Sequence, residues 1–130
     1  MSTTRGQPPA YERIAVEEGF MIPEVAAAAR ALAERNGKPM PPMTEARRAM
    51  FLDLNDLGAR RLAAMDADGI SKQLIVIGSP GVQAFDPAEG NELSRLVNDK
   101  LAAACAAHPT RFAGLAAVAP QNPLGAAREL

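Results

Sequence analysis

The feature that most constrains the fold is an uninterrupted apolar run, Leu74-Ile-Val-Ile77, which follows Lys72 and Gln73. Three of these four residues are β-branched, and β-branched side chains favour strands. A strand that is apolar at every position is expected to be covered on both faces, which is typical of parallel sheets. We therefore predict an α/β protein in which residues 72–77 form a doubly buried strand.

Further strands and helices are predicted on both sides of this run. A short apolar stretch beginning at Arg13 indicates a strand that stops at Glu17, and a third strand is expected from Phe112 to Val118. Helices are predicted at 23–35, at 44–68 with a bend near Gly58, at 86–107, and from 123 onwards. The buried face of the 86–107 helix is expected to consist of Leu93, Leu96, Val97, Leu101, Ala104 and Cys105. This alternation of strands and helices favours a sheet of about three parallel strands with flanking helices.

Composition narrows the class of protein. The chain has 130 residues, is 48% hydrophobic and only 4% aromatic, and has no Trp, so its core is small and the isolated chain is expected to be marginally stable. A net charge of -1 leaves no electrostatic footprint for nucleic acid or an anionic membrane surface. No apolar run approaches the ~20 residues of a membrane span. A small-molecule partner is therefore expected.

Location and domain boundaries follow from a few residues. A single cysteine, Cys105, cannot form an internal disulfide, which is typical of a reducing cytoplasm. Residues 1–12 contain Gly6, Pro8 and Pro9 among polar residues and are predicted to form a mobile arm. We expect residues 13–130 to form one domain.

Glu17 is the first candidate functional residue, because it closes the first predicted strand. In parallel α/β proteins the carboxyl ends of strands open into the crevice where ligands and metals bind. A carboxylate there is a hard oxygen ligand for a divalent cation such as Mn, Zn or Mg. Glu18 points to the opposite face of a regular strand and cannot serve the same site. The alternative interpretation of Glu17 is a solvated surface carboxylate, which spacing alone favours.

The other candidates are weaker. Ser79 lies in the turn Gly78-Ser-Pro-Gly81 after the strongest strand and is a candidate substrate contact, although the turn is neither a P-loop nor a nucleophile elbow. Arg47 and Arg48 are placed to hold a substrate carboxylate, or to form a solvated helix face. His108, the only histidine, is expected to sit at a helix C-terminus. Cys105 is expected to be a small core residue.

Several blocks in order resemble a known family. They are Ile14-Ala-Val-Glu-Glu-Gly-Phe20, Asp56-Leu-Gly-Ala-Arg-Arg-Leu62, Met65-Asp-Ala-Asp-Gly-Ile70, Ser79-Pro-Gly-Val-Gln83, Asn98-Asp-Lys-Leu101 and Pro109-Thr-Arg-Phe-Ala-Gly-Leu-Ala-Ala-Val-Ala-Pro-Gln121. Together they look like the amino-terminal part of amidohydrolase-related decarboxylases of the aminocarboxymuconate-semialdehyde decarboxylase group, in particular 5-carboxyvanillate and γ-resorcylate decarboxylases. The resemblance implies a TIM-like (β/α) barrel, one divalent metal, Mn or Zn, and non-oxidative decarboxylation of a hydroxylated aromatic acid.

The resemblance also defines what this chain lacks. It implies that Glu17 is a metal ligand, while Gly19 stands where many members of the family have a second ligand, a histidine. The remaining ligands and the acid and base groups of the family belong to later strands, and a closed barrel needs about 250 residues. We therefore expect a partial barrel that does not catalyse the reaction unaided. A metal-dependent hydrolase is an alternative, as is a non-catalytic fragment that assembles through exposed strand edges, for example as a homo-oligomer.

Overall fold

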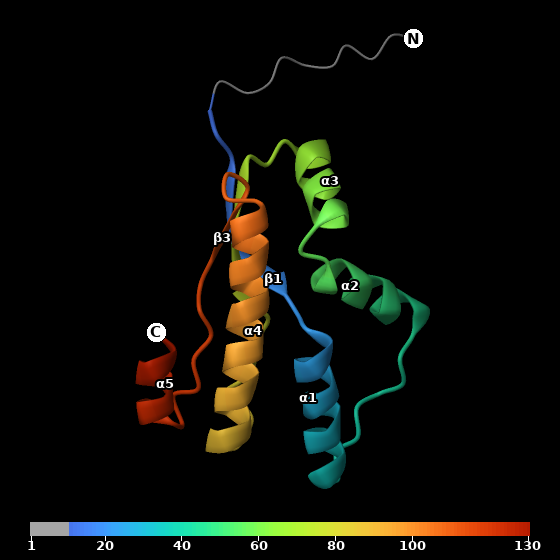
Figure 1. Ribbon diagram of the computed structural model, residues 1–130. Coiled ribbons are helices and arrows are strands. Elements are labelled where there is room, and N and C mark those ends of the chain that lie inside the picture. The colour runs from blue at the N-terminus through green and yellow to red at the C-terminus, as the bar shows by residue number, and fades with distance from the viewer. Residues whose placement is uncertain (1–10) are drawn as a thin grey trace.

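The computed structural model describes residues 11–130 as a three-stranded sheet with five helices (Figure 1). The elements are β1 (Ile14–Phe20), α1 (Pro23–Arg35), α2 (Glu45–Asn55), α3 (Ala59–Asp68), β2 (Lys72–Ile77), α4 (Pro87–Ala107), β3 (Phe112–Gly114) and α5 (Pro123–Glu129). Residues 1–10, the greater part of the predicted mobile arm at 1–12, lie outside the described residues.

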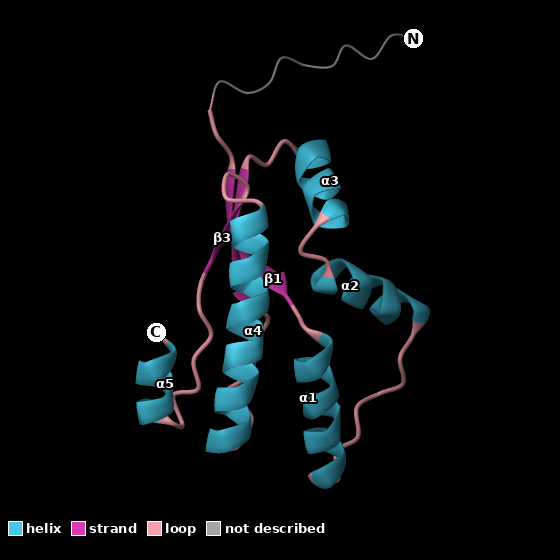
Figure 2. Ribbon diagram, in the orientation of Figure 1, coloured by secondary structure: helices cyan, strands magenta, loops and turns pink. Residues whose placement is uncertain are grey.

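The sheet confirms the predicted α/β class. Its strand order is β1-β2-β3, and both pairings are parallel. At the carboxyl edge Phe20 pairs with Ile77, and the N–H of Gly78 extends that ladder by donating to the Phe20 carbonyl at 2.9 Å. The strands lie together behind α4 in Figure 2. Among the described residues, β1 and β3 each pair on one side only.

The core lies between one face of the sheet and the helices. Ile75 is fully buried there together with Phe20 from β1, Met65 from α3, and Val97 from α4. Gln73 points to the same face and is also buried. The opposite face carries Leu74 and Val76, which are only half-buried, so the prediction of a strand buried on both faces was wrong.

The structure breaks the predicted 44–68 helix into α2 and α3 rather than bending it. Asp56 and Gly58 leave helical geometry, and the Asp56 carboxylate accepts hydrogen bonds from the backbone N–H groups of Gly58 (2.8 Å) and Arg61 (3.3 Å). These N–H groups lie at the start of α3, where they have no acceptor within the helix. The new helix therefore starts where a side chain can cap it.

Helix α4 begins as predicted, because the Asp86 carboxylate accepts from the N–H groups of Ala88 and Glu89, both at 2.9 Å. Its predicted buried face is correct except for Leu96, which is 41% exposed, and Cys105, which is only half-buried. Leu96 lies beside the buried pair Val97 and Leu93 but on the flank of the helix that faces outward. No helix among residues 11–130 is long and apolar enough to cross a membrane.

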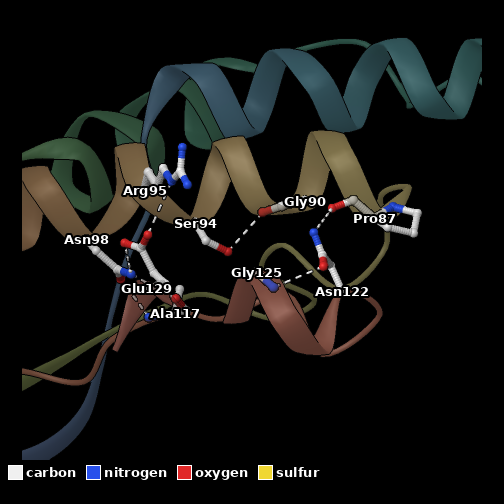
Figure 3. A network of polar contacts seen from close by, with 9 residues as sticks. All are labelled: Pro87, Gly90, Ser94, Arg95, Asn98, Ala117, Asn122, Gly125 and Glu129. Carbon is white, nitrogen blue, oxygen red and sulfur yellow. Dashed lines mark hydrogen bonds and ion pairs between the residues drawn. The ribbon is translucent and has the colours of Figure 1, made fainter. Parts of the chain in front are cut away.

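Strand β3 is shorter than the predicted 112–118, because it stops pairing after Gly114. A side chain of α4 takes over the role of a neighbouring strand. Asn98 donates to the Ala117 carbonyl at 2.9 Å and accepts from the Ala117 N–H at 2.7 Å, as Figure 3 shows. The segment after β3 is thus held in place without continuing the sheet.

Candidate functional site

Glu17 does not end its strand. Strand β1 continues for three residues to Phe20, so the prediction that it stops at Glu17 was wrong. The reason is a bulge: between the pairs Ala15 with Gln73 and Glu18 with Ile75, β1 has two residues where β2 has one. Glu17 is one of the two residues left unpaired by the bulge. It is exposed and has a φ of 60°.

A positive φ is uncommon for a residue with a side chain. The left-handed conformation crowds the Cβ atom and costs roughly 1–3 kcal/mol for a residue other than glycine. Glu17 is the only such residue in the part of the chain that the structure describes. Bulges commonly redirect a side chain near an active site. Glu17 therefore holds a backbone conformation that costs stability.

The described residues do not complete a metal site around Glu17. Within residues 11–130 there is no group of three or more His, Cys, Asp and Glu side chains that could hold an ion. A catalytic metal usually needs at least three protein ligands in fixed geometry. One carboxylate fits the chemistry of a divalent cation, but the ligand set that this part of the chain offers is too small.

Ser79 lies where the sequence places it, in the turn that leaves β2 at the carboxyl edge of the sheet. It lines a cavity of about 360 Å³ together with Val76, Gln83 and Ala117. Gly81, in the same turn, has a φ of 61° and packs closely on Ile77, which explains the glycine. Glu17 does not line this cavity, so the structure does not bring the two predicted site residues together there.

Ser79 also lines a second cavity, of about 230 Å³. Its walls are mostly apolar and come from α1, the loop before α2, α2 itself and the turn after β2. They include two aromatic residues, Phe51 and Phe85, and two arginines, Arg30 and Arg47. Apolar walls with a few charged groups are typical of sites for small organic ligands.

Of the two arginines singled out in the sequence, Arg47 lines this cavity and Arg48 does not. The Nη1 atom of Arg47 donates to the Pro41 carbonyl at 3.5 Å, a weak bond that leaves other guanidinium donors for a ligand. Sequence analysis missed Arg30, because the alanine-rich helix around it gave no sign of which face would meet the proline-rich loop. Phe51 and Phe85 were missed because nothing local in the sequence places α2 and the turn after β2 against α1.

The remaining candidates lie elsewhere. His108 is the C-terminal capping residue of α4, as predicted, and its ring packs edge-on against Phe112 with 5.4 Å between the centroids. Cys105 packs at the margin of the core, and burial raises the pKa of its thiol. Neither residue lines the two cavities that Ser79 joins.

The chain is similar in sequence and in structure to known decarboxylases. No family model matches it. A γ-resorcylate decarboxylase from Rhodococcus jostii is 36% identical over 119 residues, which are 91% of this chain and 33% of that protein. The crystal structure of 5-carboxyvanillate decarboxylase from Novosphingobium aromaticivorans, with manganese and 4-hydroxy-3-methoxy-5-nitrobenzoic acid, superimposes with a TM-score of 0.81 at 38% identity, covering 92% of this chain and 37% of that one.

The chain is homologous to one segment of these decarboxylases. An amidohydrolase from Staphylococcus aureus, 23% identical with a TM-score of 0.62 over 92% of this chain and 32% of that one, shares the fold alone. The chain spans between a quarter and about a third of the length of the curated decarboxylases it matches. The two cavities, the bulge and Glu17 all lie in the segment homologous to the decarboxylases.

Proposed function

We propose that this chain supplies one part of a metal-dependent decarboxylase that acts on a hydroxylated aromatic acid. In that reaction a ring carbon loses its carboxylate as CO₂ and gains a proton in its place. The observation that carries the proposal is Glu17: a carboxylate in a strained bulge of the first strand, in a chain whose decarboxylase homologue contains manganese.

Glu17 supplies one ligand of the divalent cation in this proposal, and the other ligands come from outside residues 11–130. Manganese is the cation that the Novosphingobium structure supports, with zinc the second choice. The portion of the barrel that the domain at residues 13–130 would supply is its opening strands, β1 to β3, and their helices.

The cavity between α1, α2 and the turn after β2 supports the aromatic acid as substrate. Phe51 and Phe85 offer apolar surface to a ring, and Arg47 offers donors to a carboxylate. Ser79 lines this cavity and the neighbouring one, where its hydroxyl is available to a polar ring substituent. The ligand in the Novosphingobium structure carries a ring, a hydroxyl and a carboxylate, the same three groups.

A chimeric enzyme tests this proposal. Residues 13–130 of this chain replace the matching segment of the Novosphingobium 5-carboxyvanillate decarboxylase, and CO₂ release is measured with Mn²⁺ present. The chimera is expected to be active. Because losing a metal ligand should cost more than losing its outer partners, Glu17→Gln is expected to lower the rate by at least about 100-fold and to reduce bound manganese.

The matched control is Glu18→Gln, which removes the neighbouring carboxylate and is expected to keep manganese and most of the activity. Equal metal content and equal rates for the two variants would reject Glu17 as a ligand. Circular dichroism of each variant shows whether it folds, and metal content is measured on folded protein only, so a folding defect is not mistaken for a lost ligand.

A second candidate is a non-catalytic assembly partner. The observation that favours it is apolar surface on and beside the two outer strands: Ile14 and Val16 on β1 are 55% and 62% exposed, and Leu115 after β3 is 48% exposed. Unpaired strands with exposed apolar side chains pair readily with another chain. In this proposal the partner is a second copy of the chain, and its oligomeric state is the test.

A further inference from the structure

The bulge in β1 is spanned by one side chain from α3. Arg61 is half-buried and uses each of its three guanidinium nitrogens once. Nη2 donates to the Gly19 carbonyl at 2.8 Å, Nη1 to the Gln73 Oε1 at 3.2 Å, and Nε to the Asp56 carbonyl at 2.9 Å. Two of these bonds reach the sheet, and the third ties the guanidinium to the start of its own helix.

The two sheet contacts fall on opposite sides of the bulge. Gln73 is the β2 partner of Ala15, the last residue in register before the bulge, whereas Gly19 is the second residue after it. The two unpaired residues of the bulge, Val16 and Glu17, lie between Ala15 and Gly19 in β1. The rigid fork of a guanidinium fixes the relative positions of two acceptors, which a lysine cannot do. Arg61 therefore connects β1 just after the bulge to the side chain of the β2 residue that pairs with β1 just before it.

Burial makes these bonds strong. Gln73 is only 7% exposed, so its carbonyl oxygen would lose a hydrogen-bond partner that water could not readily replace. Burial lowers the pKa of Arg61, while the nearby charges of Glu18 and Asp56 act against that effect and favour the cation. A charged donor in a partly buried site forms stronger hydrogen bonds than a neutral one.

We propose that Arg61 is a positioning residue for Glu17: by bonding Gln73 and Gly19 it clamps the β1 bulge and holds Glu17 in its left-handed backbone conformation. A strained conformation persists only when its surroundings over-determine it. The hydrogen bonds of β1 to β2 resume at Glu18, but they do not by themselves select one conformation for the two unpaired residues. Arg61 supplies the missing restraint. Any effect of this restraint on catalysis rests on the proposed role of Glu17 as a metal ligand.

The chain offers a matched control beside it. Arg60 is the preceding residue, carries the same group, and is ion-paired with the exposed Asp53 instead of the sheet. Replacing Arg60 removes a surface charge of the same helix without touching the bulge. Any effect specific to Arg61→Gln therefore comes from the bonds to β1 and β2.

Nuclear magnetic resonance of the 130-residue chain tests the clamp without activity. In Arg61→Gln, amide hydrogen exchange at residues 16–19 is expected to quicken by on the order of tenfold, while the amides of residues 75–77 stay within about twofold of wild type. The coupling constant between the Glu17 amide and Cα protons, which reports φ, is expected to change. Arg60→Gln is expected to change neither.

Two additions keep the test decisive. If Arg61→Gln fails to fold, Gln73→Leu removes one end of the clamp and is expected to quicken exchange at the same residues. An unchanged Glu17 coupling and unchanged exchange at 16–19 in a folded variant would overturn the proposal. The manganese content of the chimera is a separate readout: an unchanged content in Glu17→Gln would count against Glu17 as a ligand and leave the clamp standing.

Discussion

At the scale of single residues, the Asn98 side chain forms hydrogen bonds with a backbone segment that has left the sheet. Its side chain exchanges two hydrogen bonds with the backbone of Ala117, and its Nδ2 also donates to the Glu129 carboxylate at 2.9 Å (Figure 3). The segment it holds forms one wall of the cavity that Ser79 lines. One α4 side chain therefore links α5, the end of β3 and the candidate site.

Replacing Asn98 with Ala should lower the free energy of unfolding by about 1–3 kcal/mol, because the Ala117 N–H and carbonyl lose their partners. Urea denaturation followed by circular dichroism measures the change. Asp99→Ala, at an exposed position on the same helix, is the control and is expected to change stability little. A loss no larger than that of the control would show that water replaces the amide.

Because Glu17 is strained and Glu18 is not, substitution by glycine is expected to change the free energy of unfolding in opposite directions at these two positions. Glu17→Gly is expected to raise the free energy of unfolding by about 1 kcal/mol, because glycine adopts a positive φ without cost. Glu18→Gly, at a regular strand position, is expected to lower it by roughly 0.5–1 kcal/mol, since glycine weakens strands. Thermal unfolding of both variants decides the matter. Destabilisation of the same size in both would mean that Glu17 is not strained.

The sequence predicted which carboxylate to examine but not its conformation. Ile14 to Val16 indicated a strand, and Glu17 was chosen because it followed them. The bulge gives no local signal, because the residue at positive φ is not a glycine, and Gly19 is two positions away. What selects the bulge is a contact from Arg61, 42 residues later in the chain, and such a tertiary contact cannot be read from local pattern.

At the scale of elements, the α2–α3 junction depends on one carboxylate. Burial by itself would raise the pKa of Asp56, but the N–H groups of Gly58 and Arg61 outweigh burial and hold that pKa below its usual value. A carboxyl group with a depressed folded pKa stabilises the protein above its unfolded pKa of about 3.9. This contribution is lost as the pH falls through the lower, folded pKa.

Asp56→Asn keeps an accepting oxygen but removes the charge, so it is expected to cost about 0.3–1 kcal/mol of stability at neutral pH, the usual value of a negative charge at a helix N-terminus. The difference from wild type should shrink as the pH falls from about 4, where the carboxyl of the unfolded chain becomes protonated, through the lower pKa of the folded protein. Urea unfolding at a series of pH values measures both effects. Asp53→Asn, which removes an exposed carboxylate of the same junction, should differ little from wild type at any pH. A constant difference across the series would exclude the ionic contribution.

Elements were predicted best where capping chemistry is local. The start of α4 was predicted correctly at Asp86, whose side chain caps the helix, and the bend predicted near Gly58 proved to be a full break. The end of β3 was predicted worst. The chain leaves the sheet after Gly114 although β2 runs on to Ile77, and Asn98 of α4 bonds the segment beyond, a contact that is not visible in the apolar run from Phe112 to Val118.

At the scale of the whole molecule, the helices cover one face of the sheet, and the other face is half-exposed. Leu74 and Val76 lie on that second face, and β1 and β3 pair only with β2 in residues 11–130. This second face was predicted to be covered, because residues 74–77 are all apolar and successive side chains of a strand point to opposite faces. That composition is explained if the second face is covered in an assembly, as it would be by the rest of a decarboxylase or by a second copy.

Self-association is the measurable consequence for the chain in isolation. Sedimentation velocity over a range of concentrations is expected to show species larger than the 13.7 kDa monomer, because exposed apolar strands favour pairing. Val16→Lys places a charge on the exposed part of β1 and is expected to shift the distribution towards the monomer. Leu124→Lys is the control: Leu124 is 73% exposed on α5, away from the strands, and its substitution should leave the distribution unchanged. A wild-type chain that stays monomeric at every concentration would eliminate the assembly partner as a function and leave the decarboxylase segment as the proposal to pursue.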